Sequence, residues 1–458
     1  MKNKLTEQKF FAHTPEQFAE LAQEALTHAR KLGASDAAVD LSEGVGLSVS
    51  VRKGDTENVE RNRDKSLGLS VYVGQRTGSA STSDFSIAAI QATVQEAYDI
   101  ARFTAEDPHA GLPDEADLAL DASQIIDLDL YHPWQLDVND ATQIALKAEQ
   151  AAFDSSKKIV NSDGADASTY QSHFWLANSK GFQSGYAASR HSFSVAPIAK
   201  DKKSMERDYW YSAKRDPADL AAPEFVGRYA AERTLARLGA RQIPTCECSV
   251  LFEAPLAAGL LGSFVGAVSG GSLYRRTSFL QDALGQEVFA PHIFIDENPF
   301  IPKARGSSPF DGEGVLTRVR RVVHQGQVQG YFLSSYTARK LSMRTTGNAG
   351  GTHNLYFGST LTQAGDDLQA MLAKLNRGLF VTDLIGQGVN QVTGDYSRGA
   401  CGFWVENGQI AYPVNEITIA GNLKEMFKQI VAIGADTDTY GSKTTGSVLI
   451  ERMKVAGI

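Results

Sequence analysis

The chain has 458 residues, of which 42% are hydrophobic and 21% charged, with 41 glycines and a formal net charge of −8 at pH 7. This length is too great for one ordinary core and predicts two or three globular domains, while the composition excludes a disordered or fibrous chain. The acidic balance argues against a general nucleic-acid surface, because phosphate binding requires concentrated Lys and Arg, and leaves room only for a local basic patch.

The cysteines and the hydropathy pattern predict a cytoplasmic protein. The chain has three cysteines, Cys246, Cys248 and Cys401, and an odd number this small fits a reducing compartment rather than a disulfide framework. The N-terminus is charged and has no continuous apolar run, and nowhere do 18 apolar residues follow one another. We therefore expect neither a signal peptide nor contact with a membrane.

The first hundred residues predict a helix, a β-meander and a second helix. Thr14 and Pro15 form a helix start, and apolar residues then recur at helical spacing until Gly33. The period changes to two over residues 47–73, around a turn at Gly54-Asp55, which indicates half-buried antiparallel strands. Ser83 or Asp84 is expected to cap the second helix.

Residues 106–140 stand apart in composition. They include ten acidic side chains and no Lys or Arg, and three prolines interrupt any regular element. Such a composition is typical of a linker or of an exposed segment that wraps another part of the protein. An acidic cluster is also able to bind a cation, but the solvated segment is the favoured interpretation.

The stretch from Pro255 to Arg276 follows a predicted strand and has the pattern of a buried helix. Leucine and phenylalanine recur at helical spacing, small residues form a thin face, and Gly270-Gly271 is expected to end the run. Each internal glycine costs roughly 1 kcal/mol relative to alanine, so we expect close packing against another element. Between Glu253 and Arg275 there is no His, Cys, Asp, Glu, Lys or Arg, so this helix brings no metal ligand or proton carrier.

The remainder of the chain is rich in predicted strands. Residues 319–335 and 402–414 each have the pattern of an antiparallel hairpin, the second around Asn407-Gly408. A final helix is expected over Leu423–Ile433, followed by a last strand. The sequence thus predicts an α+β protein with a helix/β-meander/helix domain (1–110), a middle α/β segment that includes the acidic residues (111–240) and a large β-rich C-terminal domain (241–458).

Familiar catalytic and metal motifs are missing from the sequence. It has no H-E-x-x-H and no C-x-x-C, and its nine histidines are dispersed. Cys246 and Cys248 share one face of a strand without a second pair, and His191 fits an ordinary strand residue. The S-x-x-K pattern at Ser155 lies in a polar loop, and the glycine loops at 347–351 and 386–388 complete no phosphate-binding motif.

Residues 391–422 are denser in polar and aromatic groups than the other loops. Asp395, Tyr396 and Arg398 lie close together near the Asn407-Gly408 hairpin, as expected for a surface that grips a ligand. The alternative is structural: Asp395 would satisfy amides of a turn while Arg398 pairs with a nearby acid. The residues alone leave both interpretations open.

Longer motifs carry a resemblance to a known family. Residues 205–211 (MERDYWY), 270–280, 334–351, 394–408 and 416–427 are similar to the PmbA, or TldE, branch of the TldD/PmbA family, and the similarity spans nearly the whole chain. The resemblance implies a bacterial, cytoplasmic α+β protein. It also implies part of a heterodimeric metallopeptidase that trims or degrades unfolded peptides, in a family whose members were first known as modulators of DNA gyrase.

The sister TldD branch binds its metal through H-E-x-x-x-H on a helix, and a cysteine follows near the C-terminus. Matching that motif to this sequence puts Gly262 and Ala267 at the two histidines and Ser263 at the glutamate. No cysteine follows Tyr440. Two histidines can hold zinc and a glutamate can activate its water, but these three residues can do neither. The resemblance therefore implies no catalytic residue and no bound cofactor in this chain, with zinc expected in a TldD-like partner.

The preferred hypothesis is that the chain is the non-metal subunit of a TldD/TldE-type peptidase and completes a chamber around the partner's zinc. Asn348, Asp395, Tyr396 and Arg398 are the candidate chamber or interface residues. The expected partners are a TldD-like subunit and unfolded peptides, with no membrane and no direct nucleic-acid contact. A homodimer is expected when the partner is missing.

Two other functions are alternatives to this one. The first is a binding protein that regulates gyrase or a gyrase-directed peptide without proteolysis. The second is an autonomous hydrolase that uses a serine or cysteine, for which loss of activity in Cys401→Ala or Ser155→Ala would be required.

Overall fold

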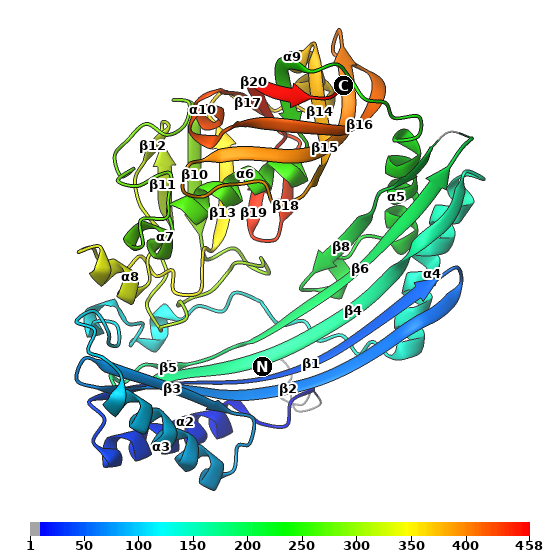
Figure 1. Cartoon of the computed structure of the whole chain (residues 1–458). Helices are drawn as coiled ribbons and strands as arrows, with labels where there is room; N and C mark the ends of the chain where they lie inside the picture. The colour runs from blue at the N-terminus through cyan, green and yellow to red at the C-terminus, as the bar shows by residue number, and fades with distance from the viewer. Residues whose placement is uncertain (1–9, 203) are drawn as a thin grey trace.

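The computed structural model describes residues 10–202 and 204–458, which fold into three β-sheets with helices packed on or between them (Figure 1). The N-terminal half forms the first sheet, and the C-terminal half forms the other two. This arrangement confirms the α+β fold class that the sequence predicts.

The first sheet is long and curved (Figure 1) and has eight strands in which all neighbours are antiparallel. Its order is β3-β2-β1-β4-β6-β7, with β5 beside β4 and β8 beside β6. The strands are β1 (Asp36–Arg52), β2 (Asp55–Val73), β3 (Arg76–Thr82), β4 (Ile159–Asn178), β5 (Gln183–Ser184), β6 (Ala187–Lys200), β7 (Met205–Arg207) and β8 (Trp210–Lys214). The predicted turn at Gly54-Asp55 joins β1 to β2. Because β1 pairs with both β2 and β4, the strands on either side of residue 110 belong to one sheet.

Four helices cover one face of this sheet: α2 (Pro15–Leu32), α3 (Ile87–Phe103), α4 (Val138–Ser155) and α5 (Pro223–Ala236). Val39 and Leu41 of β1 pack under α2 and α3, and Val49 packs under α4 and α5. Alternate residues of a strand share a face, so both helix pairs lie on the same side. The opposite face of the sheet turns toward the C-terminal half (Figure 1).

The observed ends of α2 match those predicted from the sequence, whereas the observed start of α3 does not. At α2, Thr14 caps the first turn in a capping box with Gln17, and Gly33 ends the helix in the left-handed conformation, as predicted. At α3 the cap is Ser86, so the prediction of Ser83 or Asp84 is wrong by two to three residues. Asp84 instead accepts a hydrogen bond from the Ser86 amide, at 2.9 Å.

The acidic segment 106–140 wraps against the C-terminal half, as one of its two interpretations predicts. Arg339 donates to the carbonyl oxygens of residues 109, 111 and 112, and Lys340 pairs with Asp107 at 3.1 Å. Arg344 pairs with Asp117 at 2.6 Å. Cations of the C-terminal half thus neutralise several of these carboxylates.

The C-terminal half contains two six-stranded sheets. The second sheet has the order β12-β11-β10-β13-β19-β18 and consists of β10 (Ile293–Asn298), β11 (Arg320–His324), β12 (Gln327–Val328), β13 (Asn354–Ser359), β18 (Asp438–Tyr440) and β19 (Lys443–Thr445). The third has the order β16-β15-β14-β9-β20-β17 and consists of β9 (Cys246–Phe252), β14 (Gly378–Ile385), β15 (Asp395–Glu406), β16 (Gln409–Asn422), β17 (Ile430–Ile433) and β20 (Val448–Ala456). The predicted hairpin turn at Asn407-Gly408 joins β15 to β16.

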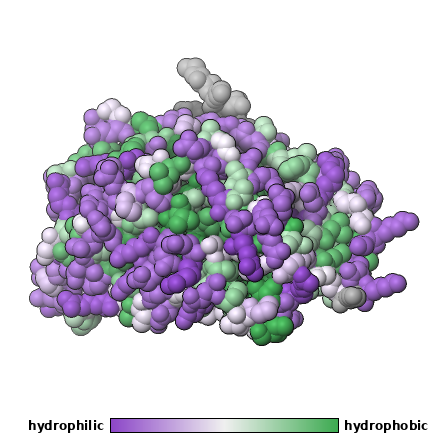
Figure 2. Space-filling view, turned by 90° about the horizontal axis from the view of Figure 1, so that it is seen from above, coloured by the Kyte–Doolittle hydropathy of each residue, from purple (hydrophilic) through white to green (hydrophobic). Residues whose placement is uncertain are grey.

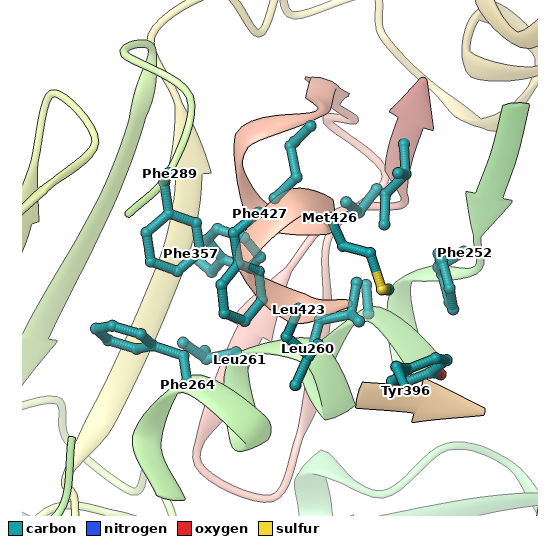
Figure 3. Close-up of a cluster of buried hydrophobic side chains, with 14 of the residues drawn as sticks. Phe252, Leu260, Leu261, Phe264, Phe289, Phe357, Tyr396, Leu423, Met426 and Phe427 are labelled. Atoms are coloured by element: carbon teal, nitrogen blue, oxygen red, sulfur yellow. The ribbon is translucent and has the colours of Figure 1, made fainter. Parts of the chain in front are cut away.

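One large core joins these two sheets, and the helix α6 (Ala254–Ala267) lies within it. Leu260, Leu261 and Phe264 of α6 point toward Met426 and Phe427 of α10 (Leu423–Lys428), as Figure 3 shows. The remaining helices are α7 (Gly270–Tyr274), α8 (Ser335–Lys340) and α9 (Leu368–Leu375).

Two predicted helix ends in this half are wrong. Gly270-Gly271 does not end the glycine-rich helix, because α6 stops at Ala267 and these glycines begin α7. The predicted helix Leu423–Ile433 ends at Lys428, since its last residues form β17 and pair with β20. The pairing of β-branched residues in a sheet outweighs their helical spacing here.

None of the helices that the structure describes combines the length and the apolar composition needed to cross a membrane. Hydrophilic side chains cover most of the face in Figure 2, and the hydrophobic ones gather in groups between them.

Candidate functional site

The helix α6 has one buried face and one open face, and its glycines at 259 and 262 lie on the open one. Ala257, Leu260 and Phe264 are at most 2% exposed and belong to the core. A Cβ atom added at Gly259 would meet no atom within 4 Å, and one at Gly262 would meet only Lys443, whose Cε lies at 3.9 Å. The prediction that the small residues pack closely against another element is therefore wrong for these two positions.

The three positions matched to the sister motif point in different directions. Gly262 lies on the open face, whereas Ala267 is completely buried in the core. Ser263 is 8% exposed, and its hydroxyl donates to the carbonyl oxygen of Gly259 at 3.1 Å, one turn earlier in the helix. None of the three side chains supplies a metal ligand or a free base to the open face.

These residues do not fit a zinc site. Zinc requires three or four nitrogen, sulfur or carboxylate ligands around one point. Across residues 10–202 and 204–458, no group of three or more His, Cys, Asp or Glu side chains is arranged to hold a metal ion. No step of a metal-dependent reaction can therefore be assigned to the side chains of the described part of this chain.

Asn348, a candidate chamber residue, lies in a buried polar network. Its amide donates to Glu297 at 2.8 Å and accepts from Arg320 at 2.9 Å, and His353 contacts the same Glu297 carboxylate at 3.0 Å. Burial alone would raise the pKa of Glu297, but the hydrogen bond from His353 and the charge of Arg320 outweigh it and lower the pKa to about 2. This network fixes the 344–353 loop to β10 and β11.

Asp395, Tyr396 and Arg398 lie together at the start of β15, as the sequence suggests, but their side chains face different surroundings. Asp395 is exposed and accepts from Thr393 at 2.7 Å and from Asn422 at 3.1 Å. Tyr396 is 4% exposed and packs its edge against Phe252, and burial raises its pKa to about 12. The hydrogen bonds of Asn348 run to a different network, and the role predicted for these four residues stays a prediction.

Arg398 lies beside Tyr396, and not all of its guanidinium nitrogens have a hydrogen-bond partner. One of its terminal nitrogens donates to the carbonyl oxygen of Leu384 at 3.4 Å, and its Nε atom is buried without a hydrogen-bond partner among the described residues. The predicted alternative, a pair between Arg398 and a nearby acid, is not observed in that part of the chain.

The other nucleophile and ligand candidates occupy structural positions. Both ring nitrogens of His191 are used, one by the Thr169 hydroxyl and the other by the carbonyl oxygen of His132, each at 2.8 Å. The Ser155 hydroxyl donates to a helix carbonyl at 2.8 Å. Cys401 is buried, and burial raises the pKa of its thiol, as it does for Cys248. A raised thiol pKa disfavours the reactive thiolate.

A group of cations and tyrosines lies next to the open face of α6, and of its members the sequence marks only Tyr209 and Tyr211, within the motif at 205–211. We call it the Arg/Tyr cluster: Arg190, Tyr209, Tyr211, Arg305, Tyr440 and Lys443. Lys443 contacts the Gly262 position, and burial together with the charge of Arg305 lowers its pKa. Burial and Arg305 also lower the pKa of Arg190. The cluster joins the first sheet to the β18–β19 hairpin.

Comparison with known proteins identifies relatives over nearly the whole chain. Family profiles match residues 37–101 as PmbA/TldA metallopeptidase domain 1, residues 131–238 as the central domain and residues 245–457 as the C-terminal domain. Metalloprotease PmbA of Escherichia coli O157:H7 is 46% identical over 440 residues, covering 95% of this chain and 96% of that protein. The Metalloprotease PmbA homolog of Haemophilus influenzae is 44% identical, covering 94% of each chain.

Solved structures have the same fold. A Bacteroides thetaiotaomicron protein described as a modulator of DNA gyrase superposes with a TM-score of 0.90 at 26% identity, over 97% of this chain and all of that one. TldE of Thermococcus kodakarensis superposes with a TM-score of 0.80 over 95% of this chain and all of its own. At 17% identity, the second likeness is evidence for the fold alone.

Proposed function

The chain belongs to the PmbA/TldD metallopeptidase family, and on that basis we propose that it is the non-metal subunit of a two-subunit peptidase. In this proposal a TldD-like partner holds the zinc, and this chain forms part of the wall around it. The substrates are unfolded peptides, which the wall admits while it excludes folded proteins.

The observation that carries the proposal is the composition of α6. The relatives are named metalloproteases, yet Gly262, Ser263 and Ala267 provide no ligand at the positions matched to the sister subunit's motif. Glycine at 259 and 262 costs helix stability and leaves the backbone bare on the open face. A helix kept bare in this way suits a surface that another chain or a substrate approaches closely.

The edge of the second sheet offers a way to bind an extended peptide. Among the described strands, β18 pairs only with β19 and ends that sheet, and both strands lie next to α6. A peptide that adds to an edge strand gains main-chain hydrogen bonds without regard to its sequence. This mode of binding suits a peptidase for unfolded segments.

The test is a peptidase assay of this chain alone, of its TldD-like partner alone and of the mixture, with an unfolded peptide and a folded protein as substrates. We expect the mixture to cleave the peptide, a chelator to stop it, and this chain alone to be inactive. Elemental analysis is expected to find stoichiometric zinc in the partner and none in this chain. Strong, chelator-sensitive cleavage by this chain alone would overturn the proposal.

Substitutions at the motif positions give a matched control. Replacing the motif glutamate of the partner should abolish the activity of the mixture, whereas Ser263→Ala in this chain should leave it unchanged, because the Ser263 hydroxyl donates to a helix carbonyl. Light scattering should find this chain as a homodimer without the partner. Gyrase that co-purifies with the chain in cells lacking the partner would instead favour the regulatory function.

A further inference from the structure

The three cations of the Arg/Tyr cluster come from distant parts of the chain. Arg190 lies on β6, Arg305 in the loop after β10, and Lys443 on β19. The fold brings their backbones together: Arg215 donates to the carbonyl oxygens of Ser189 and Arg305, at 3.3 Å and 3.0 Å, and a Cβ atom added at Gly306 would lie 2.8 Å from the Cβ atom of Ser442. Within the described residues, no carboxylate lies within 4.0 Å of any of the three, although Arg233, Arg237 and Arg320 of the same protein all have one. Like charges held together without a counter-ion destabilise the folded chain.

The tyrosines of the cluster present exposed ring surface beside these cations. The rings of Tyr209 and Tyr211 stack with centroids 6.5 Å apart, and Tyr440 meets Tyr211 edge-on at 6.4 Å. Tyr209 is 51% exposed and Tyr440 is 50% exposed. Burial, followed by the charge of Asp438, raises the pKa of Tyr211 to about 12. Asp438 thus acts on the tyrosines, and within the described chain it forms no ion pair with the three cations.

The geometry of the first sheet aligns part of the cluster on one face. Arg190 of β6 lies opposite Tyr170 of β4, and Tyr211 of β8 lies opposite Ser194 of β6. Directly paired residues share a face, and Arg190 and Ser194 are an even number of residues apart. The face they share is the one opposite Phe193 and Val195, and therefore opposite the helices.

We propose that Arg190, Arg305 and Lys443 form a subsite for a carboxylate of a bound peptide, with the tyrosine rings supporting the adjacent peptide chain. Arg and Lys form charge-assisted hydrogen bonds to carboxylates, and flat aromatic rings pack against peptide groups and side chains. A Cβ atom added at Gly262 would lie 3.9 Å from the Cε atom of Lys443, and one at Gly259 would meet no atom within 4 Å, so a main chain can approach α6 closely beside Lys443. This inference rests on the proposed function and names the chemistry of its substrate.

A peptide fits these observations better than a nucleic acid. The chain carries a net charge of −8, and the cluster together with the adjacent Arg215 has four cations, whereas binding of a phosphate backbone depends on many. One carboxylate neutralises a few cations at one point. The carboxylate is either the C-terminus of the peptide or an acidic side chain, and the test separates these two sources.

The test measures peptide binding to this chain alone, by fluorescence anisotropy at low salt. Four versions of one labelled, unstructured ten-residue peptide are compared: with a free or an amidated C-terminus, and with one internal Glu or Gln. We expect the version with neither carboxylate to bind at least tenfold more weakly, and the two single changes to identify which carboxylate is bound. Equal affinity for all four versions would overturn the inference.

Substitutions then locate the subsite. Lys443→Gln and Arg305→Gln are each expected to weaken binding of the carboxylate peptide about tenfold, and not to weaken binding of the peptide without carboxylates. Arg30→Gln, which removes one exposed cation from α2 on the far side of the sheet, should change neither. Unchanged carboxylate binding in Lys443→Gln, with the protein folded by circular dichroism, would overturn the inference. A single-stranded oligonucleotide that binds through Lys443 when the peptides do not would also overturn it.

The binding test can fail separately from the proposed function. Cleavage by the mixture with equal rates on all four peptides would retain the two-subunit peptidase and overturn the carboxylate subsite. Carboxylate-dependent binding to this chain, with no cleavage by any mixture, would retain the subsite and overturn the peptidase proposal.

Discussion

Two charged regions of the molecule differ in whether each charge has a partner of opposite charge. Around Glu297, the charged groups are paired and largely buried, and Arg320, Asn348 and His353 all contact the same carboxylate. In the Arg/Tyr cluster, three cations lie near one another without an acid to pair with among the described residues. Stability explains the first region. In the second region, repulsion between unpaired cations lowers the stability of the folded chain, so stability does not explain these residues and a function such as binding is expected.

The largest expected effect is the loss of Arg320, which would sharpen this comparison. In Arg320→Met, the Glu297 carboxyl, which is 1% exposed, loses its arginine partner, and we expect a loss of about 4 kcal/mol in the free energy of unfolding. Urea denaturation followed by fluorescence measures it. The control is Arg321→Met on the same strand, whose pair with Asp296 lies at the surface and should cost less than about 1 kcal/mol. Equal losses in the two variants would remove the distinction between the regions.

The pH dependence of the Glu297 network gives the next effect. Because its pKa in the folded protein is about 2, below the ordinary 4.5, Glu297 stabilises the protein above pH 4.5, and this contribution is lost as the pH falls toward 2. We expect the free energy of unfolding of the wild type to exceed that of Glu297→Gln by about 3 kcal/mol at pH 7, and by progressively less below pH 4.5. Urea midpoints between pH 7 and pH 3 measure this difference. A difference that stays constant or grows on acidification would contradict it.

A substitution on the open face of α6 should stabilise the protein. Gly259→Ala adds a methyl group where no atom lies within 4 Å, and we expect a gain of about 1 kcal/mol from helix propensity. The matched control is Gly227→Ala on α5, where the new Cβ would clash with the carbonyl oxygen of Ala148, and a loss of about 2 kcal/mol is expected. Thermal unfolding of both variants measures the difference. Destabilisation by Gly259→Ala would mean that the face is not open in solution.

The smallest effect concerns the cations of the Arg/Tyr cluster themselves. Lys443→Gln relieves repulsion from Arg305, and we expect a gain of up to about 0.5 kcal/mol. Lys374→Gln removes a lysine that pairs with Asp366 at 2.7 Å, and we expect the free energy of unfolding to fall by a similar amount. Differential scanning calorimetry compares the two variants. A loss of stability in Lys443→Gln would indicate that this cation has a structural partner after all, and would break the comparison.

The sequence predicts elements well where local chemistry decides them. The cap at Thr14, the stop at Gly33 and the turns at Gly54 and Gly408 depend on a few neighbouring residues, and the structure has all of them. The start of α3 is less determined, because serine and aspartate at several positions are equally good caps. The strand β17 forms because β20 lies beside it, which no local pattern reveals.

The candidate site shows where sequence reasoning stops. The sequence shows that one face of α6 consists of small residues. Such a face fits either close contact with another element or an open surface, and only the fold distinguishes the two. Asp395 and Tyr396 are recognisable as a group because they are neighbours in the chain. Arg190 and Arg305 lie near each other only through the packing of the first sheet against the C-terminal half, so nothing in their local sequence marks them.

The pairing of β1 with β4 has a consequence for the order in which the protein is made. These strands join over fourteen residue pairs, from Ala38 with Asn178 to Val51 with Ala165. During synthesis β1 therefore emerges long before its second partner, and its backbone donors and acceptors stay unpaired on that side while the ribosome adds roughly a hundred residues. An unpaired edge of this length is an aggregation hazard during folding. A fragment that ends at residue 110 would keep this hazard permanently, so any fragment of the first sheet should extend at least through β4.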